Sequence, residues 1–600
     1  MTHPRRILIS GPTPTLQHFK ELASRAADLG GTHVVVSDLP KSRWQWERDL
    51  SDPYPNWGML RPSFFKVIVP SELKEWLPVD YAKRNLEILV TRSEILKEHG
   101  LKALFVGIEP SWLPEEVYLA NPEWRGPRVD QPRRARKPYF SPCTDNAEIR
   151  SIYRRTVTEL CRHVPIENFD LLTNDSGGGL CWASSLYPGA NGPTSCQHRS
   201  ISERIVRFLD CIQDGVREAG LNPVISLQYG AGSLQALRSD VEPTVALLKP
   251  GQILHGRTKE GAVTTITTGD DQNYNLLYPT VGIPQAVRYA SQLSGLSSTP
   301  KANLYLRFLL GEPNWVYSMV AKLIKSSSHG IRERWSTLAE TVEEELGLGD
   351  SNAFLELCQS LDQALAYLSV VFVEPLLLLG LVNQRILTRP LVPFPNELSP
   401  EEKNHWRKFQ FQANDDKEAD DLNNFQGFNP YKGYSGAYTA SLNLNKVDEE
   451  LAKAIPLCGS VISSSPEKSR EELSLLKARL NVFRGLVRSA RNAIQYQSVL
   501  DQTEPDMQPG ERATQFPHEG DQRLRKLNAI ARNEIDNCSE LAKLLEIHPH
   551  GQLVKQATKE EPEDIFILPD NLVAQLRLKA AIMVRHLNDA HRIYERRQGE

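Results

Sequence analysis

Several features that would place a chain in a special class are scarce in this sequence. Its 600 residues include only eight cysteines, which lie far apart and form no CxxC pair. Neither a disulfide framework nor a zinc knuckle is therefore indicated, and we expect free, buried thiols. The length suggests roughly two to four domains.

Long apolar runs are also lacking. The longest, LSVVFVEPLLLLGLV at 368–382, is interrupted by Glu374 and Pro375 and is too short to cross a bilayer. We interpret it as a buried helix with a break. The N-terminal MTHPRRILIS has no apolar segment of signal-peptide length. We therefore expect a cytoplasmic protein that has no membrane partner.

A strong net charge is absent as well. The formal charge is −4, with 24% charged and 40% hydrophobic residues, which is ordinary for a globular protein. The composition has no excess of basic residues of the kind that binds nucleic acid, so we expect no nucleic-acid partner. The most basic stretch, 121–146, contains Arg125 and five further Arg or Lys residues. It could bind an acidic sugar through arginine, or it could be a solvated loop face.

The first half of the sequence alternates short apolar runs with amphipathic segments. Helical spacing of apolar residues, with serine or asparagine at the start and often glycine at the end, predicts the helices. Near-continuous apolar runs predict parallel strands that are covered on both faces. The expected helices are 15–31, 80–100, 146–165, 200–220 and one near 234–248, and the expected strands are 5–11, 32–38, 101–110, 169–175, 222–230, 251–257, 261–268 and 303–311.

This alternation predicts an α/β fold, a (β/α)8 TIM-like barrel over residues 1–330. The gap between the strands at 251–257 and 261–268 is too short for a helix, and the barrel model does not explain that connection. The alternative is an open doubly wound sheet. That fold would place a glycine-rich phosphate loop after the first strand, and ISGPTPTLQ is not one.

Helical periodicity dominates the second half, which predicts a mainly α-helical C-terminal domain over 331–600. Polar stretches near 411–439 and 501–522 are interpreted as mobile loops. The amphipathic helices also offer surfaces through which the chain could form a homo-oligomer.

Polar residues follow the predicted strands, and several of them are acidic. In a barrel the residues at the carboxyl ends of the strands form the active site. Single strand-end carboxylates are usually helix caps or ion-pair partners, but their recurrence favours chemistry. The strand-end residues are Ser10, Asp38, Glu109, Asp175, Tyr229, His255 and Glu312.

Aromatic residues crowd the loops that follow these strand ends. Sugar rings stack on aromatic faces, so aromatics beside carboxylates suggest a carbohydrate substrate. The alternative is that the long loops fold into small cores of their own. We predict substrate contacts from Asn174, Asp38, Trp112, Trp124, Arg125, Trp182, Tyr229, His255 and Trp315.

The segment FDLLTNDSGGGLCW at 169–182 places Asp175 before three glycines. Such glycines let the backbone approach a ligand closely. Cys181, Cys196 and His198 follow, but three candidates at irregular spacing are too few for structural zinc. We expect no metal and no cofactor.

The strand ending in Asn174-Asp175, the glycine-rich segment and the spaced cysteines resemble a signature of glycoside hydrolase-like barrel proteins related to α-glucuronidases and hexosaminidases. PYFSPCTDNAEIRSIY at 138–153 is similar to the segment that precedes the helix before the fourth strand in these proteins. The resemblance covers about 102–330. It implies that the acid lies at the end of the fourth strand, but hexosaminidases carry an Asp-Glu pair there and α-glucuronidases a lone Glu. This chain has neither.

The resulting hypothesis is a glycoside hydrolase. Asp175 would be the general acid, and Glu312 or Glu109 would be the nucleophile or base. One alternative is a non-catalytic carbohydrate-binding or scaffold protein. A metal-dependent sugar isomerase or lyase is a third, but it would need a metal cluster at the strand ends, where His255 is the only histidine.

Overall fold

The computed structural model describes residues 5–39, 62–129, 137–173, 196–228, 238–269, 276–326, 330–371, 385–410, 420–423, 434–501, 517–559, 561–563 and 567–595. The chain divides into two compact units. The first comprises Met1–Gly269, Gln292–Phe308 and Ile324–His329, and the second comprises Asp270–Ser291, Leu309–Leu323 and Gly330–Glu600. The division into domains at 330 stays a prediction.

A single sheet forms the centre of the first unit, and all eight predicted strands occur in it. Most of their residues are buried or partly buried, as expected for apolar runs, except in β11, where Thr265 and Thr267 are exposed. These strands are β1 (Ile7–Ser10), β2 (His33–Val35), β3 (Lys102–Ile108), β6 (Ile166–Leu172), β7 (Val224–Gln228), β8 (Gln252–Leu254), β11 (Thr265–Thr268) and β12 (Asn303–Arg307).

The eight strands are parallel and follow the order β8-β7-β6-β3-β2-β1-β12-β11. Ile7 lies opposite Leu304, and Leu8 lies opposite His33, so the first strand sits between the second and the last. This is the neighbour order of a (β/α)8 barrel. Within the described part of the chain no backbone pairing joins β8 to β11, so closure of the barrel stays a proposal.

A hairpin occupies the connection between β8 and β11 that the sequence left unexplained. β9 (Arg257–Thr258) pairs antiparallel with β8 and with β10 (Gly261–Ala262), which makes the sheet ten-stranded. Lys259 and Glu260 form the exposed turn. The connection is short because a β-hairpin replaces the helix of a βα unit.

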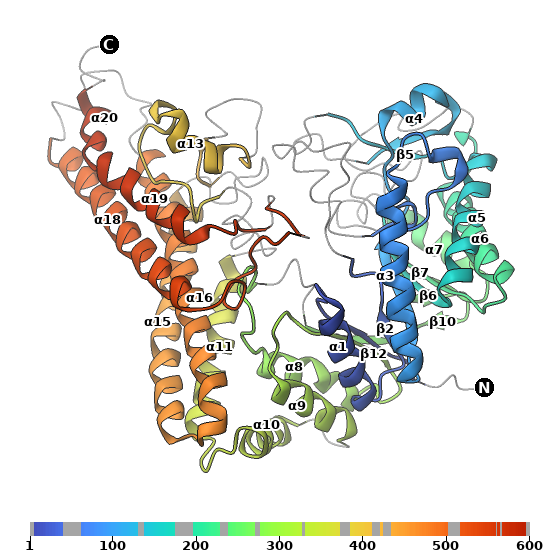
Figure 1. Ribbon diagram of the computed structural model, residues 1–600, viewed down its shortest axis with the longest axis horizontal. Helices are drawn as coiled ribbons and strands as arrows, with labels where there is room; N and C mark the ends of the chain where they lie inside the picture. Colours follow the sequence, from blue (N-terminus) through green and yellow to red (C-terminus); the bar gives the residue numbers. More distant parts are fainter. Residues whose placement is uncertain are drawn as a thin grey trace. The chain divides into compact units, whose positions relative to one another are not determined.

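Four helices of the first unit, α1, α3, α5 and α6, begin within one residue of the predicted start, whereas α7 begins at Arg238, inside its predicted range, and α4 was not predicted. Asn146 caps α5 by accepting the N–H groups of Glu148 and Ile149. Ser200 and Glu203 form a capping box on α6. Figure 1 shows α5 and α6 side by side, with α7 next to α6. The helices are α1 (Leu16–Asp28), α3 (Val79–Glu98), α4 (Glu115–Ala120), α5 (Ala147–His163), α6 (Ile201–Glu218) and α7 (Arg238–Leu247), and β4 (Arg125–Arg128) and β5 (Phe140–Pro142) form a separate pair.

The second unit is mainly helical, as predicted. Neighbouring helices pack in the series α11, α15, α16, α18 and α19 (Figure 1). α8 (Ala286–Leu293) and α9 (Asn314–Lys325) belong to it for most of their length. Its further helices are α10 (Ile331–Leu346), α11 (Asn352–Val371), α13 (Pro400–Arg407), α15 (Tyr434–Ser464), α16 (Glu467–Asp501), α18 (Pro517–Ile547), α19 (Leu572–Arg585) and α20 (Arg592–Glu595).

Both predicted loops of this unit extend too far. Residues 434–439 form the first turns of α15, and residues 517–522 form the first turns of α18. The other parts of the two loops lie outside the described residues, apart from 420–423 and Asp501. α15 contains Pro456 and a polar N-terminal part, and its packing on α11 and α16 offsets these unfavourable local preferences.

A buried ion pair connects α18 and α19. Lys579 Nζ donates to Glu534 Oε1 at 2.6 Å, and both side chains are fully buried. Lys579 also donates to the carbonyls of Ile386 at 2.8 Å and Leu387 at 3.2 Å. Glu534 accepts further bonds from Ser489 Oγ and Asn492 Nδ2, both at 2.7 Å. The pair therefore holds the segment after residue 385 against the helices.

Two other expectations concern cysteines and membranes. The seven described cysteines are free and buried, which confirms the expectation for them, and Cys181 lies outside the described residues. No helix of the described chain combines the length and apolarity that spanning a membrane requires.

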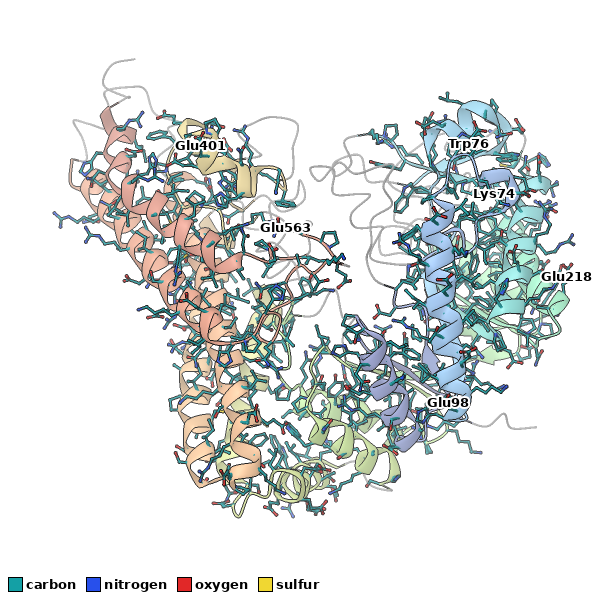
Figure 2. All side chains as sticks on the ribbon, in the orientation of Figure 1. Lys74, Trp76, Glu98, Glu218, Glu401 and Glu563 are labelled. Atoms are coloured by element: carbon teal, nitrogen blue, oxygen red, sulfur yellow. The ribbon has the colours of Figure 1, made fainter. Side chains whose placement is uncertain are left out.

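Among the charged residues that Figure 2 labels, Glu563 contacts Arg385 at 3.5 Å and Lys408 at 3.8 Å within the second unit.

Candidate functional site

The carboxyl edge of the parallel sheet brings together several residues that the sequence singled out. Backbone pairing continues beyond the strands: the Glu109 N–H donates to the Leu172 carbonyl at 2.8 Å, and the His255 N–H donates to the Leu227 carbonyl at 3.0 Å. Glu109 and His255 therefore lie at the same edge, where Asp38 also follows its strand. This edge is where a parallel α/β fold places its active site.

Asp38 connects the first two loops of this edge. Its Oδ2 accepts the Thr13 N–H at 2.8 Å and the Thr13 hydroxyl at 3.2 Å. Arg92 of α3 is buried and donates to the carbonyls of Val36 at 2.8 Å, Asp38 at 2.6 Å and Thr13 at 2.8 Å. Burial lowers the pKa of Arg92 to about 10, at which it remains charged at neutral pH. Asp38 thus has an architectural task, and its contact with a substrate stays a prediction.

Glu109 is fully buried and surrounded by donors. Its Oε1 accepts the Phe64 N–H at 2.5 Å, and its Oε2 accepts the Ser111 N–H at 3.2 Å and the Tyr153 hydroxyl at 3.1 Å. Burial raises the pKa of Glu109 to about 7, and the hydrogen bonds and Lys66 act in the opposite direction. Both oxygens are engaged, so this carboxyl group organises the loops around it.

Lys66, in the short 3₁₀ helix η2 (Phe64–Lys66), is the cation near Glu109. Burial lowers the pKa of Lys66 to about 7, and Glu109 acts against that shift. Its Nζ lies 5.8 Å from the ring centre of Trp112. A cavity of about 10 Å³ adjoins this region, which holds about one water molecule and no sugar. Ser63, Phe65, Lys66, Leu77, Ser111, Trp112 and Leu113 line it.

The two tryptophans near Glu109 are interior residues. Trp112 is 6% exposed and packs with Val129 and Tyr139, with ring centres of Trp112 and Tyr139 6.2 Å apart. Trp124 is 4% exposed, and its Nε1 donates to Glu148 Oε2 at 3.1 Å. Their surroundings do not support stacking on a sugar. They fit the alternative, in which the long loops form small cores of their own.

Two further predicted substrate-binding residues are Arg125 and His255. Arg125 is half-buried, pairs with Glu115, and lies 4.5 Å from the ring centre of Phe140. His255 has a positive φ of 47°, which is uncommon for a residue other than glycine. Burial lowers the pKa of His255, which favours the neutral imidazole. A sugar-binding role for either residue stays a prediction.

Glu312 belongs to the second unit and differs from Glu109 in one respect. Its Oε2 accepts the Tyr289 hydroxyl at 3.0 Å and the Leu309 N–H at 3.3 Å. Its Oε1 has no hydrogen-bond partner of good geometry in the described chain, but the Gln285 backbone N–H lies close enough to lower the pKa of the group, and both polar atoms of the Gln285 side chain are buried without a partner. Burial raises the pKa of Glu312 to about 7. Oε1 therefore receives no side-chain hydrogen bond from the described residues.

Trp315, three residues beyond Glu312, is also an interior residue. It is 2% exposed, and its ring centre lies 5.3 Å from that of Phe354 in an edge-to-face arrangement. Like Trp112 and Trp124, it fits a local core and not a stacking surface.

The remaining predicted site residues lie outside the described part of the structure. They are Asn174, Asp175, Trp182 and Tyr229. Their proposed roles stay predictions from the sequence.

Sequence analysis missed five side chains that shape these surroundings: Lys66, Arg92, Tyr153, Gln285 and Tyr289. Two of them carried a signal. Lys66 is a lone charge within the apolar run at 64–69, and Arg92 lies between Leu89 and Leu96 on the apolar face of the helix predicted at 80–100. A charge at a core position indicates a buried partner.

The structure offers no metal site among its described residues, in which no three His, Cys, Asp or Glu side chains are grouped to hold an ion. Cys196 packs against Cys143 in the interior, and His198 is exposed. Cys181 lies outside the described residues.

Comparison with known proteins relates this architecture to solved structures. No protein-family model and no curated protein matches the chain. A GH138 enzyme targeting pectin rhamnogalacturonan II has a TM-score of 0.51 and 11% identity, over 99% of this chain and 84% of that chain. At this identity the likeness concerns the fold alone.

Two further solved structures have lower TM-scores. An O-GlcNAc hydrolase of Thermobaculum terrenum has a TM-score of 0.38 and 11% identity, over 100% of this chain and 97% of that chain. The GH36 α-galactosidase AgaA of Geobacillus stearothermophilus has a TM-score of 0.31 and 13% identity, over 54% of this chain and 41% of that chain. The specific relation to α-glucuronidases stays a prediction.

Proposed function

We propose that the chain is a glycoside hydrolase that cleaves a glycosidic bond with a pair of carboxyl groups. The observation that carries the proposal is the succession of acidic residues after parallel strands in barrel order. Asp38 and Glu109 lie at the carboxyl edge of the described sheet, and Glu312 follows β12 in the chain. Similarity of the fold to a glycoside hydrolase supports the choice of chemistry.

Asp175 is the proposed general acid, which protonates the leaving oxygen. For the second carboxyl group, the surroundings favour Glu312 over Glu109. Both oxygens of Glu109 accept hydrogen bonds, from Phe64, Ser111 and Tyr153, whereas Oε1 of Glu312 has no side-chain donor in the described chain and only the Gln285 backbone N–H near it. Burial raises the pKa of both glutamates to about 7, which suits a base near neutral pH but does not distinguish them. Glu312 then acts as base or nucleophile, and Glu109 supports the loops.

The test is hydrolysis of a panel of aryl glycosides that includes uronides. The wild-type chain is expected to cleave at least one of them. Asp175→Asn and Glu312→Gln should each lower kcat by about 10²–10⁴-fold, the usual contribution of general acid or base catalysis. Glu98→Gln is the matched control, because this exposed glutamate ends α3, at the opposite edge of the sheet from the strand ends (Figure 2). It should leave kcat unchanged.

Three outcomes would contradict parts of this proposal. Full activity of Asp175→Asn would exclude Asp175 as the acid. Full activity of Glu312→Gln, together with inactive Glu109→Gln, would exchange the roles of the two glutamates. Sugar binding without cleavage of any compound in the panel would favour a carbohydrate-binding protein that has no hydrolase activity.

A further inference from the structure

Arg479 lies in the middle of α16 and connects three segments of the second unit. Its Nε donates to the Gln552 carbonyl at 3.2 Å, and its Nη1 donates to the Gly282 carbonyl at 3.2 Å. The Gly282 N–H in turn donates to the Leu310 carbonyl at 2.8 Å. The guanidinium is therefore tied, through one turn, to the segment that carries Glu312.

Two glycines make room for this guanidinium. Gly282 has a φ of 63°, and Gly311 has a φ of 73°, both in the left-handed region. A Cβ at Gly282 would collide with the Arg479 guanidinium and lie 2.6 Å from the Gly311 carbonyl oxygen. A Cβ at Gly311 would lie 2.7 Å from Val281 Cγ1 and 3.3 Å from Arg479 Nη2. Close approach of these three residues thus depends on the absence of both side chains.

The charged side chain that acts on Glu312 comes from α16. Glu312 is 5% exposed and faces the Tyr289 hydroxyl of α8 and the Arg479 guanidinium of α16. Burial raises the pKa of Glu312, and the positive charge of Arg479 acts against that shift; burial lowers the pKa of Arg479, and Glu472 and Glu312 act against it. Glu472 lies about two helical turns before Arg479 in α16. Its charge acts to raise the pKa of Arg479, and burial and the charge of Glu345 raise the pKa of Glu472.

We propose that Arg479 is a positioning residue for Glu312, which fixes the turn at Gly282 and Gly311 and supplies the positive charge that the carboxylate faces. The inference rests on the proposed function, because it assigns Arg479 a task at the carboxyl group assumed to react. It gives the C-terminal helices a part in the chemistry, since a residue of α16 prepares a group that follows the last strand of the sheet.

Three variants of the full chain separate the hydrogen bonds by which Arg479 fixes the turn from its positive charge. Arg479→Met removes both. Arg479→Lys keeps the charge but cannot form two hydrogen bonds in the same fork. Lys477→Met is the matched control, because it removes one positive charge from the same helix, and no described contact joins Lys477 to Gly282 or Gly311. Far-UV circular dichroism verifies that each variant is folded.

The first readout is amide hydrogen exchange in peptides covering 279–291 and 305–316, which requires no activity. Arg479→Met should raise the exchange rate there by about tenfold or more, the effect of local opening once a fixing contact is lost. Arg479→Lys should give an intermediate rate, and Lys477→Met the wild-type rate. Unchanged exchange in Arg479→Met would overturn the inference, whether or not the wild-type chain hydrolyses glycosides.

The second readout is the pH dependence of kcat/KM on the glycoside that the wild-type chain cleaves. The acidic limb should move to higher pH by about one unit in Arg479→Met, the smallest shift typical of losing a nearby opposite charge. It should stay in place in Arg479→Lys and Lys477→Met. An unmoved limb in an active Arg479→Met enzyme would refute coupling to Glu312. Absence of hydrolysis in the wild-type chain would instead refute the proposed function. Hydrogen exchange would then test only whether Arg479 fixes the turn at Gly282 and Gly311.

Discussion

Removal of the buried lysine that pairs with Glu534 should be one of the most destabilising single changes in the second unit. In Lys579→Met, the Glu534 carboxylate loses its cation at 2.6 Å, and the carbonyls of Ile386 and Leu387 lose a donor. Breaking a buried pair by removing one partner costs about 3–5 kcal/mol. Glu534 keeps two neutral donors, Ser489 and Asn492, so we expect the lower half of that range.

The assay is native-state hydrogen exchange in peptides of α18 and α19, because these peptides report on the unit that contains the pair. Lys543→Met on α18 is the matched control, since Lys543 is exposed. It should change the free energy of opening by less than about 0.5 kcal/mol. The double variant Lys579→Met with Glu534→Leu should lose less stability than the sum of the single variants, because it leaves no unpaired charge inside.

Two results would refute this reasoning. A free energy of opening for Lys579→Met within about 0.5 kcal/mol of the wild-type value would mean that the lysine does not stabilise the unit. Strict additivity of the two changes would mean that Lys579 and Glu534 do not interact energetically, despite their short distance.

Two further predictions concern the first unit. Because burial raises the folded-state pKa of Glu109 to about 7, above the unfolded value of about 4.3, the folded state retains a proton and the free energy of unfolding decreases as pH rises between these values, by up to about 1.4 kcal/mol per unit. Glu109→Gln should remove this share of the slope in urea unfolding measured at pH 5, 6 and 7, and an unchanged slope would contradict it. Arg92→Met should cost roughly 3 kcal/mol in the same assay at constant pH, because three carbonyls lose a charged donor. Arg84→Met, an exposed control on α3, should cost less than about 0.5 kcal/mol, and an equal loss in both would exclude the proposed contacts.

The fold of the first unit could be predicted because its signals are local. Buried parallel strands give continuous apolar runs, and helices give a 3.6-residue period with caps such as Asn146 and Ser200. The hairpin at 257–262 could not be assigned, since two-residue strands are too short to show a period. The first turns of α15, at 434–439, were assigned to a loop for a different reason: their helical state depends on packing against α11 and α16, which are distant in the sequence.

The candidate site was predictable only in part. The order of strands places Asp38 and Glu109 at one edge, and that follows from the alternation of strands and helices. Their partners do not follow from local sequence. The Tyr153 hydroxyl is 44 positions from Glu109, and Arg92 is 54 positions from Asp38. The tryptophans illustrate the same limit, because an aromatic residue in a polar loop has the same local pattern whether it faces a sugar or its own small core.

The hairpin formed by β9 and β10 offers a place to attach a spectroscopic probe. Its turn, Lys259 and Glu260, is exposed, whereas the seven described cysteines are buried. A single cysteine introduced at Lys259 would present an accessible thiol beside the edge strand. A spectroscopic probe attached there would report on that rim of the sheet without replacing any side chain assigned to hydrolysis.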